Sequence, residues 1–542
     1  MVFTLHRYIL RELLRVFVLT TVTLTFVLSL SSMLRPIQEF GVGPGQAVHI
    51  LGYFIPIILT VVLPMSALFS ASLVYGRFAG DNELDACRAS GISLMTLIYP
   101  GLCLAVAISI TTLILSFHVV PAFVARAEKS IQGNAKQILF RNIQRKGFYE
   151  IPGDRHRIIY ADQAFPATDT LVGVVVVDSK NKTINKRMFA RRAKIQIETA
   201  RDSTKVAIIA QEAYQIDEHN IQSAYLQEFS VEMTFPPMLG DDIKFQKLDR
   251  LKEIQADMSN FEPVREVAIA AKNQLATELL SESIRKQIAI EDNNYYQMRS
   301  ENRVIMFTAA GCSVKGEGTV VLSPPIELRE YDVVLEPLHK WYSDEPGTIE
   351  FKDDVMDPAP VLILKNASWE RVVDGYKSPT PVPRRVIEGL TLSETIKSKL
   401  HSKKLLDLME TIPADSAEPI LENPPSKELS KLYRRLKNEI RYTSRDITAE
   451  IHSRLVFGIG SIVLILIAIA LGISLKGGHM LSAFGISALP AGALVVFVIS
   501  GKQLTKTLNT NIPEYAGPLM MWFGVVFLCI VTVILYRKLM RT

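Results

Sequence analysis

The residues of this 542-residue chain that could do covalent chemistry are not arranged in any pattern that catalysis or metal binding requires. The segment Gly311–Glu317 has the glycine spacing of a phosphate-binding loop. It lacks the closing Lys-Ser/Thr pair, whose ammonium and hydroxyl groups reach phosphate and Mg²⁺. The motifs HExxH and GxSxG do not occur, and the four cysteines form neither a CxxC pair nor a Cys/His cluster. We therefore predict no catalytic residue, no metal site and no cofactor.

A short charged segment between two apolar stretches is the strongest candidate for a binding surface. Residues 77–92 are expected to contain a short helix. Its candidate contact residues are Arg77, Asp81, Glu83, Leu84, Asp85 and Arg88. Asp81 and Asp85 are four residues apart, which would put them on one face of a helix. The segment is either a solvated connector or a helix on which a cytoplasmic partner docks.

Six long stretches contain no Asp, Glu, Lys or Arg. They are Val16–Leu34, Phe40–Gly76, Ala89–Ala125, Leu455–Leu475, Gly477–Gly501 and Tyr515–Tyr536. A helix needs about 20 apolar residues to cross a bilayer core of roughly 30 Å. A charge at its centre costs about 2.5–3.5 kcal/mol. The sequence therefore predicts three membrane spans, a soluble block of roughly 123–452, and three further spans. The first run is longer than that of a signal peptide, so we expect it to be an uncleaved span.

The basic residues predict the orientation of the spans. Nine of them fall on one side if both termini are cytoplasmic: Arg7, Arg11, Arg15, Arg77, Arg88, Lys476, Arg537, Lys538 and Arg541. The other short loops hold only Arg35, Lys502 and Lys506, so the soluble block is expected outside the cytoplasm. That block has 47 basic and 49 acidic residues out of 60 and 55 in the whole chain. This near-neutral balance argues against nucleic-acid binding.

The soluble block changes its periodicity along the chain. Residues 140–235 alternate in β-branched runs separated by turn residues, which is typical of an antiparallel sandwich or jellyroll. Residues 248–303 have a helical composition. Strand-like runs follow at 319–322, 326–335 and 361–364, and the proline-rich stretch 378–385 resembles a linker. Helices are expected again at 390–410 and at 427–454, where the second helix runs into span 4.

Three motifs resemble the LptF/LptG permease family. The loop before span 3 reads Tyr75-Gly-Arg, then Asn82-Glu-Leu, then Ala89-Ser-Gly, which is similar to the family's coupling-helix region. The opening residues Arg7–Glu12 and the start of span 4 at Glu450–Arg454 are similar to family patterns as well. The resemblance covers both membrane thirds and roughly Phe123–Phe235. It implies six spans with a periplasmic β-jellyroll between the third and fourth.

The resemblance also implies a role. LptF-like and LptG-like subunits pair, bind a dimer of the ATPase LptB, and extract lipopolysaccharide from the inner membrane. They pass the lipid to bridge proteins of the LptC/LptA type. Glu83 matches the coupling-helix glutamate that contacts the ATPase. Arg35 falls where some members have a basic residue near the lipid phosphates, although it could equally be an interfacial anchor. Lipid contact is further expected near Leu30 in span 1 and Val496 in span 5.

The soluble block is much longer than one jellyroll. We expect spans 1–3 at 1–122, a jellyroll part at 123–254, an insertion at 255–385, a helical return at 386–452 and spans 4–6 at 453–542. The insertion is expected to be helical and then strand-rich. Two other functions remain open: a permease subunit for another lipid, and a membrane-anchored scaffold or sensor whose outer domain binds protein. The sequence does not distinguish an F-like from a G-like subunit.

Overall fold

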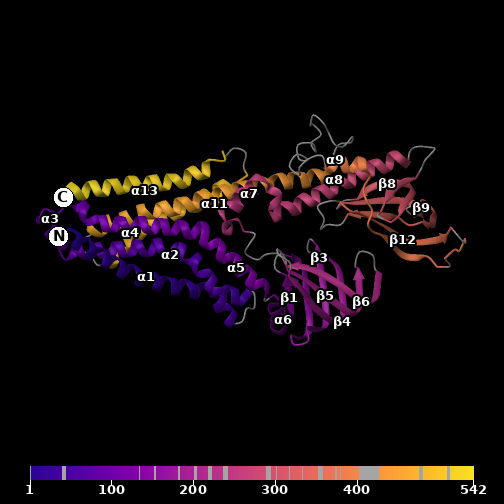
Figure 1. Cartoon of the computed structure of the whole chain (residues 1–542), viewed down its shortest axis with the longest axis horizontal. Helices are drawn as coiled ribbons and strands as arrows, with labels where there is room; N and C mark the ends of the chain where they lie inside the picture. Colours follow the sequence, from indigo (N-terminus) through magenta and orange to yellow (C-terminus); the bar gives the residue numbers. More distant parts are fainter. Residues whose placement is uncertain are drawn as a thin grey trace. The chain divides into compact units, whose positions relative to one another are not determined.

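The computed structural model describes residues 2–39, 44–133, 135–151, 154–180, 183–199, 204–217, 222–235, 242–288, 295–300, 302–315, 318–332, 334–351, 358–372, 375–378, 380–401, 426–474, 480–508 and 513–541. The chain forms two compact units (Figure 1). The first contains Met1–Lys252 and Arg445–Thr542, and the second contains Glu253–Ser444.

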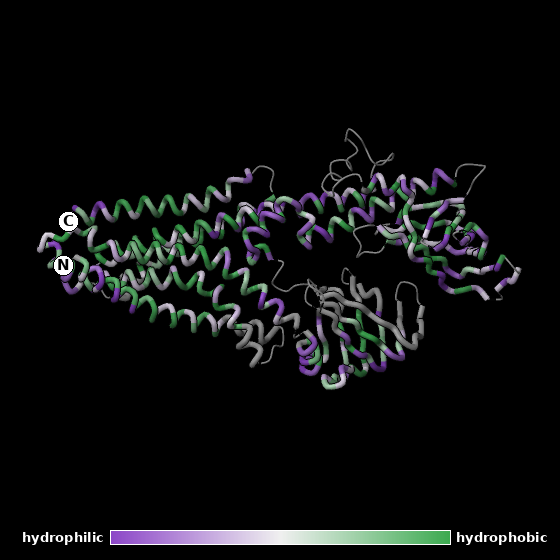
Figure 2. Tube along the Cα trace, viewed as in Figure 1, coloured by the Kyte–Doolittle hydropathy of each residue, from purple (hydrophilic) through white to green (hydrophobic). Residues whose placement is uncertain are grey.

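Among the described residues, six helices are long and apolar enough to cross a membrane, which confirms the predicted spans. Spans 1, 2 and 5 lie in α1 (Val2–Glu39), α2 (Pro44–Gly80) and α12 (Met480–Lys506). Span 3 runs through α4 (Leu94–Ile114), the π-helical turn η1 (Leu115–Val119) and α5 (Val120–Gly133). Spans 4 and 6 lie in α11 (Lys427–Ser474) and α13 (Ala516–Arg541). Apolar residues dominate all of them (Figure 2).

Small residues allow the membrane helices to approach closely. A Cβ atom added to Gly472 of α11 would lie 2.7 Å from the carbonyl oxygen of Ser72 in α2. Likewise, a Cβ on Gly517 of α13 would lie 2.5 Å from the carbonyl oxygen of Gly501 in α12. Both values are far below ordinary contact distances, so larger side chains at these positions would separate the helices. Such crossings are the usual way in which membrane helices associate, because lipid gives no hydrophobic drive between them.

The strands of the first unit form one antiparallel sheet. It contains β1 (Phe148–Ile151), β2 (Asp154–Phe165), β3 (Thr170–Lys180), β4 (Thr183–Thr199), β5 (Thr204–Asp217) and β6 (Gln222–Phe235). Each strand pairs with the next in sequence, in the order β1-β2-β3-β4-β5-β6. The preceding helix α6 (Ala135–Lys146) adds Leu139, Phe140 and Ile143 to the same apolar core as Ile159 of β2. The predicted β-rich domain is thereby confirmed.

The second unit has its own helices and its own sheet. The helices are η3 (Met258–Asn260), α8 (Glu262–Ile288) and α9 (Glu394–His401). Two further helices are shared with the first unit: the end of α7 (Leu248–Ala256) and the beginning of α11 belong to the second. The strands are β7 (Tyr296–Arg299), β8 (Val304–Lys315), β9 (Thr319–Tyr331), β10 (Pro337–Ser343), β11 (Gly347–Phe351), β12 (Pro360–Arg371) and β13 (Val382–Ile387). The short strands β10 and β11 both lie between β9 and β12 and pair with different parts of them. Helix α8 shares the core of this sheet.

Two local expectations are wrong. The predicted linker at 378–385 contributes Val382–Arg385 to strand β13, which pairs with β12 despite Pro383. An edge strand tolerates proline because one side of it has no partner to which an N–H must donate. The predicted helical stretch 248–303 ends at Ile288, and Tyr296–Arg299 forms strand β7. Part of the helix expected at 390–410 is α9, while residues 402–410 lie outside the described residues.

Candidate functional site

The predicted docking segment forms a short helix at one end of the helix bundle. Helix α3 (Glu83–Ala89) joins α2 to α4, and both chain termini lie beside it (Figure 1). Asn82 precedes α3 in a left-handed conformation with φ of 54°, which turns the chain sharply at the end of α2. Ser93 then starts α4, where its hydroxyl accepts a hydrogen bond from the Thr96 N–H at 3.3 Å. This N-cap stabilises the first turn of α4, where the loop ends.

The six predicted contact residues divide by exposure. Asp81, Glu83 and Arg88 are exposed and Asp85 is half-buried, whereas Leu84 is buried in the core shared by the membrane helices. Leu84 therefore anchors α3 while its charged neighbours face outward. The expectation that Asp81 and Asp85 share a helix face is wrong. Asp81 belongs to the turn before α3, where its N–H still donates to the Arg77 carbonyl at 2.9 Å.

Arg77, whose side chain is 33% exposed, also makes contacts inside the helix bundle. Its guanidinium donates to Glu12 of α1 at 3.3 Å and lies 5.3 Å from the centre of the Phe78 ring. The Phe78 ring in turn stacks on Tyr8 of α1, with ring centres 5.5 Å apart. The first turns of α1 are thus tied to the end of α2 immediately before the docking helix.

An apolar cavity lies further along α1 and α2. It has a volume of about 530 Å³. Its wall consists of Leu19, Thr20, Thr23, Leu24, Val27 and Leu28 from α1, of Val61, Val62, Met65, Leu68 and Phe69 from α2, and of Ala488 from α12. The hydroxyls of Thr20 and Thr23 donate to carbonyls of their own helix, so they need no partner in the cavity. The cavity is suited to hydrocarbon.

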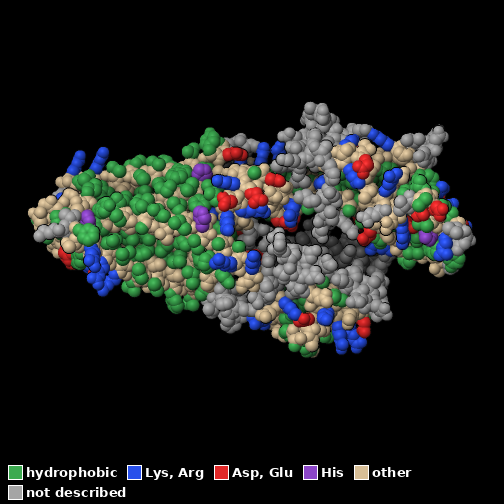
Figure 3. All heavy atoms as spheres, viewed as in Figure 1, with side chains coloured by type: hydrophobic (Ala, Val, Ile, Leu, Met, Phe, Trp, Pro, Cys, Tyr) green, Lys and Arg blue, Asp and Glu red, His purple; other side chains and the backbone are tan. Residues whose placement is uncertain are grey.

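The predicted lipid contacts Leu30 and Val496 do not belong to the wall of this cavity. Leu30 is exposed on α1, two residues after Leu28 of the cavity wall, and Val496 is exposed on α12. Arg35 belongs to α1, but its side chain lies outside the part of the chain that is described in full. Figure 3 shows a broad apolar surface over the membrane helices, with Lys and Arg side chains at its two ends. Leu30 and Val496 belong to the exposed apolar residues of these helices.

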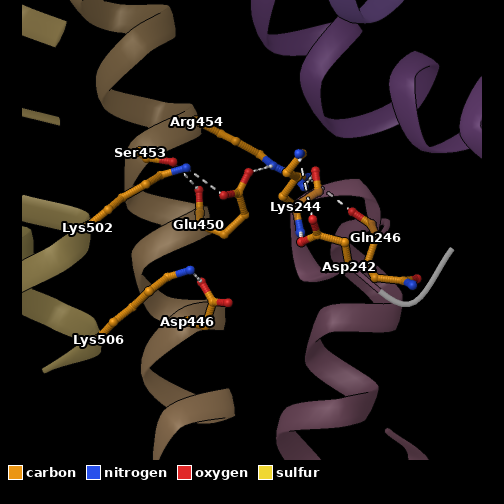
Figure 4. Close-up of polar contacts among 9 residues, drawn as sticks. All are labelled: Asp242, Lys244, Gln246, Asp446, Glu450, Ser453, Arg454, Lys502 and Lys506. Atoms are coloured by element: carbon orange, nitrogen blue, oxygen red, sulfur yellow. Dashed lines mark hydrogen bonds and ion pairs between the residues drawn. The ribbon is translucent and has the colours of Figure 1, made fainter. Parts of the chain in front are cut away.

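A buried ion-pair network, which the sequence reasoning missed, joins spans 4 and 5 (Figure 4). Glu450 of α11 accepts from Arg454 Nε at 2.9 Å and from Lys502 of α12 at 2.7 Å. One turn away, Lys506 of α12 pairs with Asp446 of α11 at 2.7 Å. The signal was present in the sequence, because the acids at 446 and 450 and the lysines at 502 and 506 are each four residues apart.

Arg454 extends the network to the segment that follows the first sheet. Its two terminal nitrogens donate to the backbone carbonyls of Lys244 at 2.9 Å and Gln246 at 3.1 Å (Figure 4). Lys244 lies within the turn η2 (Ile243–Phe245), and Gln246 follows it directly. The Arg454 guanidinium also lies 5.5 Å from the centre of the Phe117 ring in the π-helical turn of span 3. One buried arginine therefore connects spans 3 and 4 to the polypeptide that returns from the β-domain.

Comparison with known families identifies the chain. A family model described as lipopolysaccharide export system permease LptF/LptG matches residues 7–304 and 342–538, which include both membrane thirds and most of the soluble block. A search of curated proteins finds no match to this chain. The internal segment without a match, 305–341, contains nearly all of β8, the whole of β9 and part of β10. The chain therefore belongs to the LptF/LptG family of lipopolysaccharide export permeases, and it is a multi-pass inner-membrane transport protein rather than an enzyme.

Proposed function

We propose that this chain is a permease subunit of an ABC-type complex that extracts lipopolysaccharide, or a related lipid, from the inner membrane. A separate LptB-like ATPase dimer supplies the energy on the cytoplasmic side, where both termini and α3 lie. A second LptF/LptG-like subunit completes the membrane part. LptC/LptA-like bridge proteins receive the lipid from the periplasmic β-domain.

The observation that carries this proposal is a continuous path from α3 to the apolar cavity. Leu84 fixes α3 in the membrane core, and the Arg77–Glu12 pair links the same region to α1. Residues 19–28 of that helix form half of the cavity wall. Movement of α3 by a docked ATPase would therefore be transmitted to the helix that contacts the lipid.

The exposure of α1 supports a second subunit. In the most apolar 18-residue stretch of α1, only 11% is buried, compared with 50% in the corresponding stretch of α2. Val22, Phe26 and Leu30 are each at least 60% exposed. The cavity volume of about 530 Å³ lies within the range of roughly 300–1,000 Å³ that is usual for small-molecule sites. In the complex, the partner's helices would close this side and make a larger chamber for several acyl chains.

We also propose that residues 255–385 are an insertion in the family's periplasmic domain, followed by a helical return at 386–452. Two observations support this division. Residues Glu253–Ser444 form their own compact unit with a separate sheet. Within the proposed insertion, residues 305–341 have no match in the family model, whereas 255–304 and 342–385 are matched.

The coupling half of the proposal is tested by Glu83→Ala. Loss of an exposed carboxylate that pairs with the ATPase should weaken ATPase binding about tenfold, which corresponds to one charged hydrogen bond. Co-purification and stimulated ATP hydrolysis in nanodiscs measure the effect, and Glu83→Asp should be milder. Glu514→Ala is the matched control, because this exposed carboxylate lies between α12 and α13. If Glu83→Ala and Glu514→Ala behave alike, α3 is only a connector.

The lipid half is tested by photo-crosslinking in the assembled complex. A crosslinker at Leu24 or Leu28 of the cavity should capture lipopolysaccharide in an ATP-dependent manner. The matched control is Val533, an exposed residue of α13 that does not belong to the cavity wall, which should capture bulk phospholipid throughout. Capture of another lipid would show that the chain is a permease subunit for a different lipid. Capture of none, with ATPase bound and turning over, would favour the scaffold.

A further inference from the structure

A second cavity lies in the sheet of the second unit, and its lining is mainly polar and aromatic rather than aliphatic. It has a volume of about 410 Å³. Its wall combines charged and aromatic side chains: Arg303, Glu330, Leu338, His339, Trp341, Trp369 and Arg385. Four of these residues belong to segment 305–341, which the family model does not match. We call these seven residues the tryptophan pocket.

The centre of the tryptophan pocket is a carboxylate at a core position. On β9, Ile326, Leu328 and Glu330 alternate with exposed or half-buried residues, so all three point to the same buried face. Glu330 is only 1% exposed. Burying a charge at such a position is costly unless it is paired. Arg385 donates to Glu330 Oε1 at 3.0 Å, while Arg303 and His339 each stay 3.7 Å from Oε2.

Two indole rings form the wall beside this carboxylate. Trp341 of β10 lies directly opposite Trp369 of β12, and their ring centres are 6.1 Å apart at 37°. His339 meets the Trp369 ring edge-on at 5.4 Å. The Arg385 guanidinium lies 4.8 Å from the centre of the Trp341 ring. Two of the three tryptophans of the chain are therefore gathered in one pocket.

Three buried polar atoms of the tryptophan pocket lack a hydrogen-bond partner among the described residues. They are Glu330 Oε2, Trp341 Nε1 and Arg385 Nε, which are one acceptor and two donors. Buried polar groups are nearly always hydrogen-bonded in folded proteins, and each exception calls for an explanation such as a missing ligand. A ligand that satisfies all three atoms has to offer at least one donor and two acceptors.

We propose that the tryptophan pocket binds an acidic saccharide. The C–H face of a sugar ring can lie on the half-buried Trp369 indole, while its hydroxyls donate to Glu330 and accept from Trp341 and Arg385. Two guanidiniums against one carboxylate leave a net positive charge, so a carboxylate or phosphate on the sugar can pair with half-exposed Arg303. A simple anion would leave the Trp369 face unused, and an apolar ligand would leave the three polar atoms without a hydrogen bond. The assignment stands on this geometry and does not depend on lipid transport.

The test is a titration of the full-length protein in nanodiscs, followed by tryptophan fluorescence. Methyl glucuronide should give a saturable change, and the neutral methyl glucoside should bind about tenfold more weakly, because it lacks the charged contact. Trp369→Ala and Arg303→Gln should each weaken glucuronide binding about tenfold, the equivalent of one such contact. Arg303 is half-exposed, so Arg303→Gln keeps the test valid if Trp369→Ala fails to fold.

Two matched controls separate the tryptophan pocket from general effects. Arg329→Gln removes the same charge from the opposite face of β9, where Arg329 pairs with Glu327, and it should leave binding unchanged. Trp522→Phe removes the tryptophan of α13 and should leave the fluorescence response unchanged. No saturable response to methyl glucuronide would overturn the proposal. Inorganic phosphate that binds as tightly as the glucuronide, with Trp369→Ala having no effect, would overturn it too.

The source of the saccharide is distinguished by two further probes. The acidic glycan released from lipopolysaccharide and a free oligosaccharide of glucuronate carry the same chemistry on different carriers. Tighter binding of the released glycan would identify the headgroup of a lipid as the ligand, and tighter binding of the other would identify a free saccharide. None of the variants in this series touches α3 or the apolar cavity, so the result is independent of the transport tests.

Discussion

The first unit and the second unit each bury a glutamate among basic residues. The hydrogen bonds of the carboxylate are complete in the first unit and incomplete in the second. Both oxygens of Glu450 accept a hydrogen bond, one from Arg454 and one from Lys502. Each of the three guanidinium nitrogens of Arg454 donates a hydrogen bond. Glu330 has one oxygen bonded to Arg385 and one without a hydrogen bond, and nearby donors on Trp341 and Arg385 are also unused.

This difference distinguishes a network that stabilises helix packing from a site that can bind a ligand. A fully paired network repays the desolvation of its charges only within the fold, so it holds helices in register and has no capacity left for a ligand. A half-paired network is unfavourable until something supplies the missing bonds. The same residue types therefore connect helices around Glu450 and form a pocket around Glu330.

The largest expected effect comes from Glu450→Ala. Arg454 is buried and Lys502 is half-buried, so removing their shared carboxylate should lower the free energy of unfolding by about 3–5 kcal/mol. Thermal unfolding in nanodiscs measures this loss. The control Glu514→Ala removes a carboxylate that is 75% exposed and should cost less than about 1 kcal/mol. Equal losses in the two variants would show that the network around Glu450 is not closed.

Arg454→Lys should have the next largest effect. A single ammonium cannot reach Glu450 and two backbone carbonyls together, so at least one charged hydrogen bond is lost, at about 1.5–3 kcal/mol. The amides of Phe245 and Gln246, which donate within the turn η2, should then exchange faster with deuterium. Exchange of α8 in the second unit serves as the internal reference. Unchanged exchange at 245–246 would mean that the arginine does not hold this turn.

Glu330→Gln should destabilise the protein by only about 1 kcal/mol in the absence of ligand, the value of an ordinary hydrogen bond. Arg303, Arg385 and His339 are each 30–50% exposed, so water can solvate them when the carboxylate is neutralised. Glu450→Gln is the matched variant and should cost clearly more. If the two cost the same, the contrast between a closed and an open network fails.

Lys244→Ala should have the smallest effect, within about 0.5 kcal/mol of the parent protein. Arg454 bonds the backbone carbonyl of Lys244, and the lysine side chain is 57% exposed beside Asp242. Complementation and thermal unfolding should both be unchanged. A strong defect would show that the side chain, rather than the backbone, carries the link to α11.

Several features followed from the sequence because they are local. The length of an apolar run decides whether a helix can cross a bilayer, so the six spans could be predicted without any knowledge of their neighbours. Alternation over two residues likewise predicted the strands of the first sheet. The docking segment was found in the same way, although its helix begins only at Glu83, and its orientation and partners remain predictions.

Pairing between distant residues could not be predicted, because it depends on which helices and strands become neighbours. Arg77 was expected to be a docking residue, and its pairing with Glu12 of α1, 65 residues away, could not be predicted. Lys502 and Lys506 looked like loop charges until α12 packed along α11. Glu330 lies in an ordinary alternating strand, and only the joining of β9, β10, β12 and β13 buries it beside two indoles. The sequence by itself determined which segments cross the membrane and which form strands. The tertiary structure alone decided which buried charges are satisfied, because burial and hydrogen bonding are properties of contacts between segments.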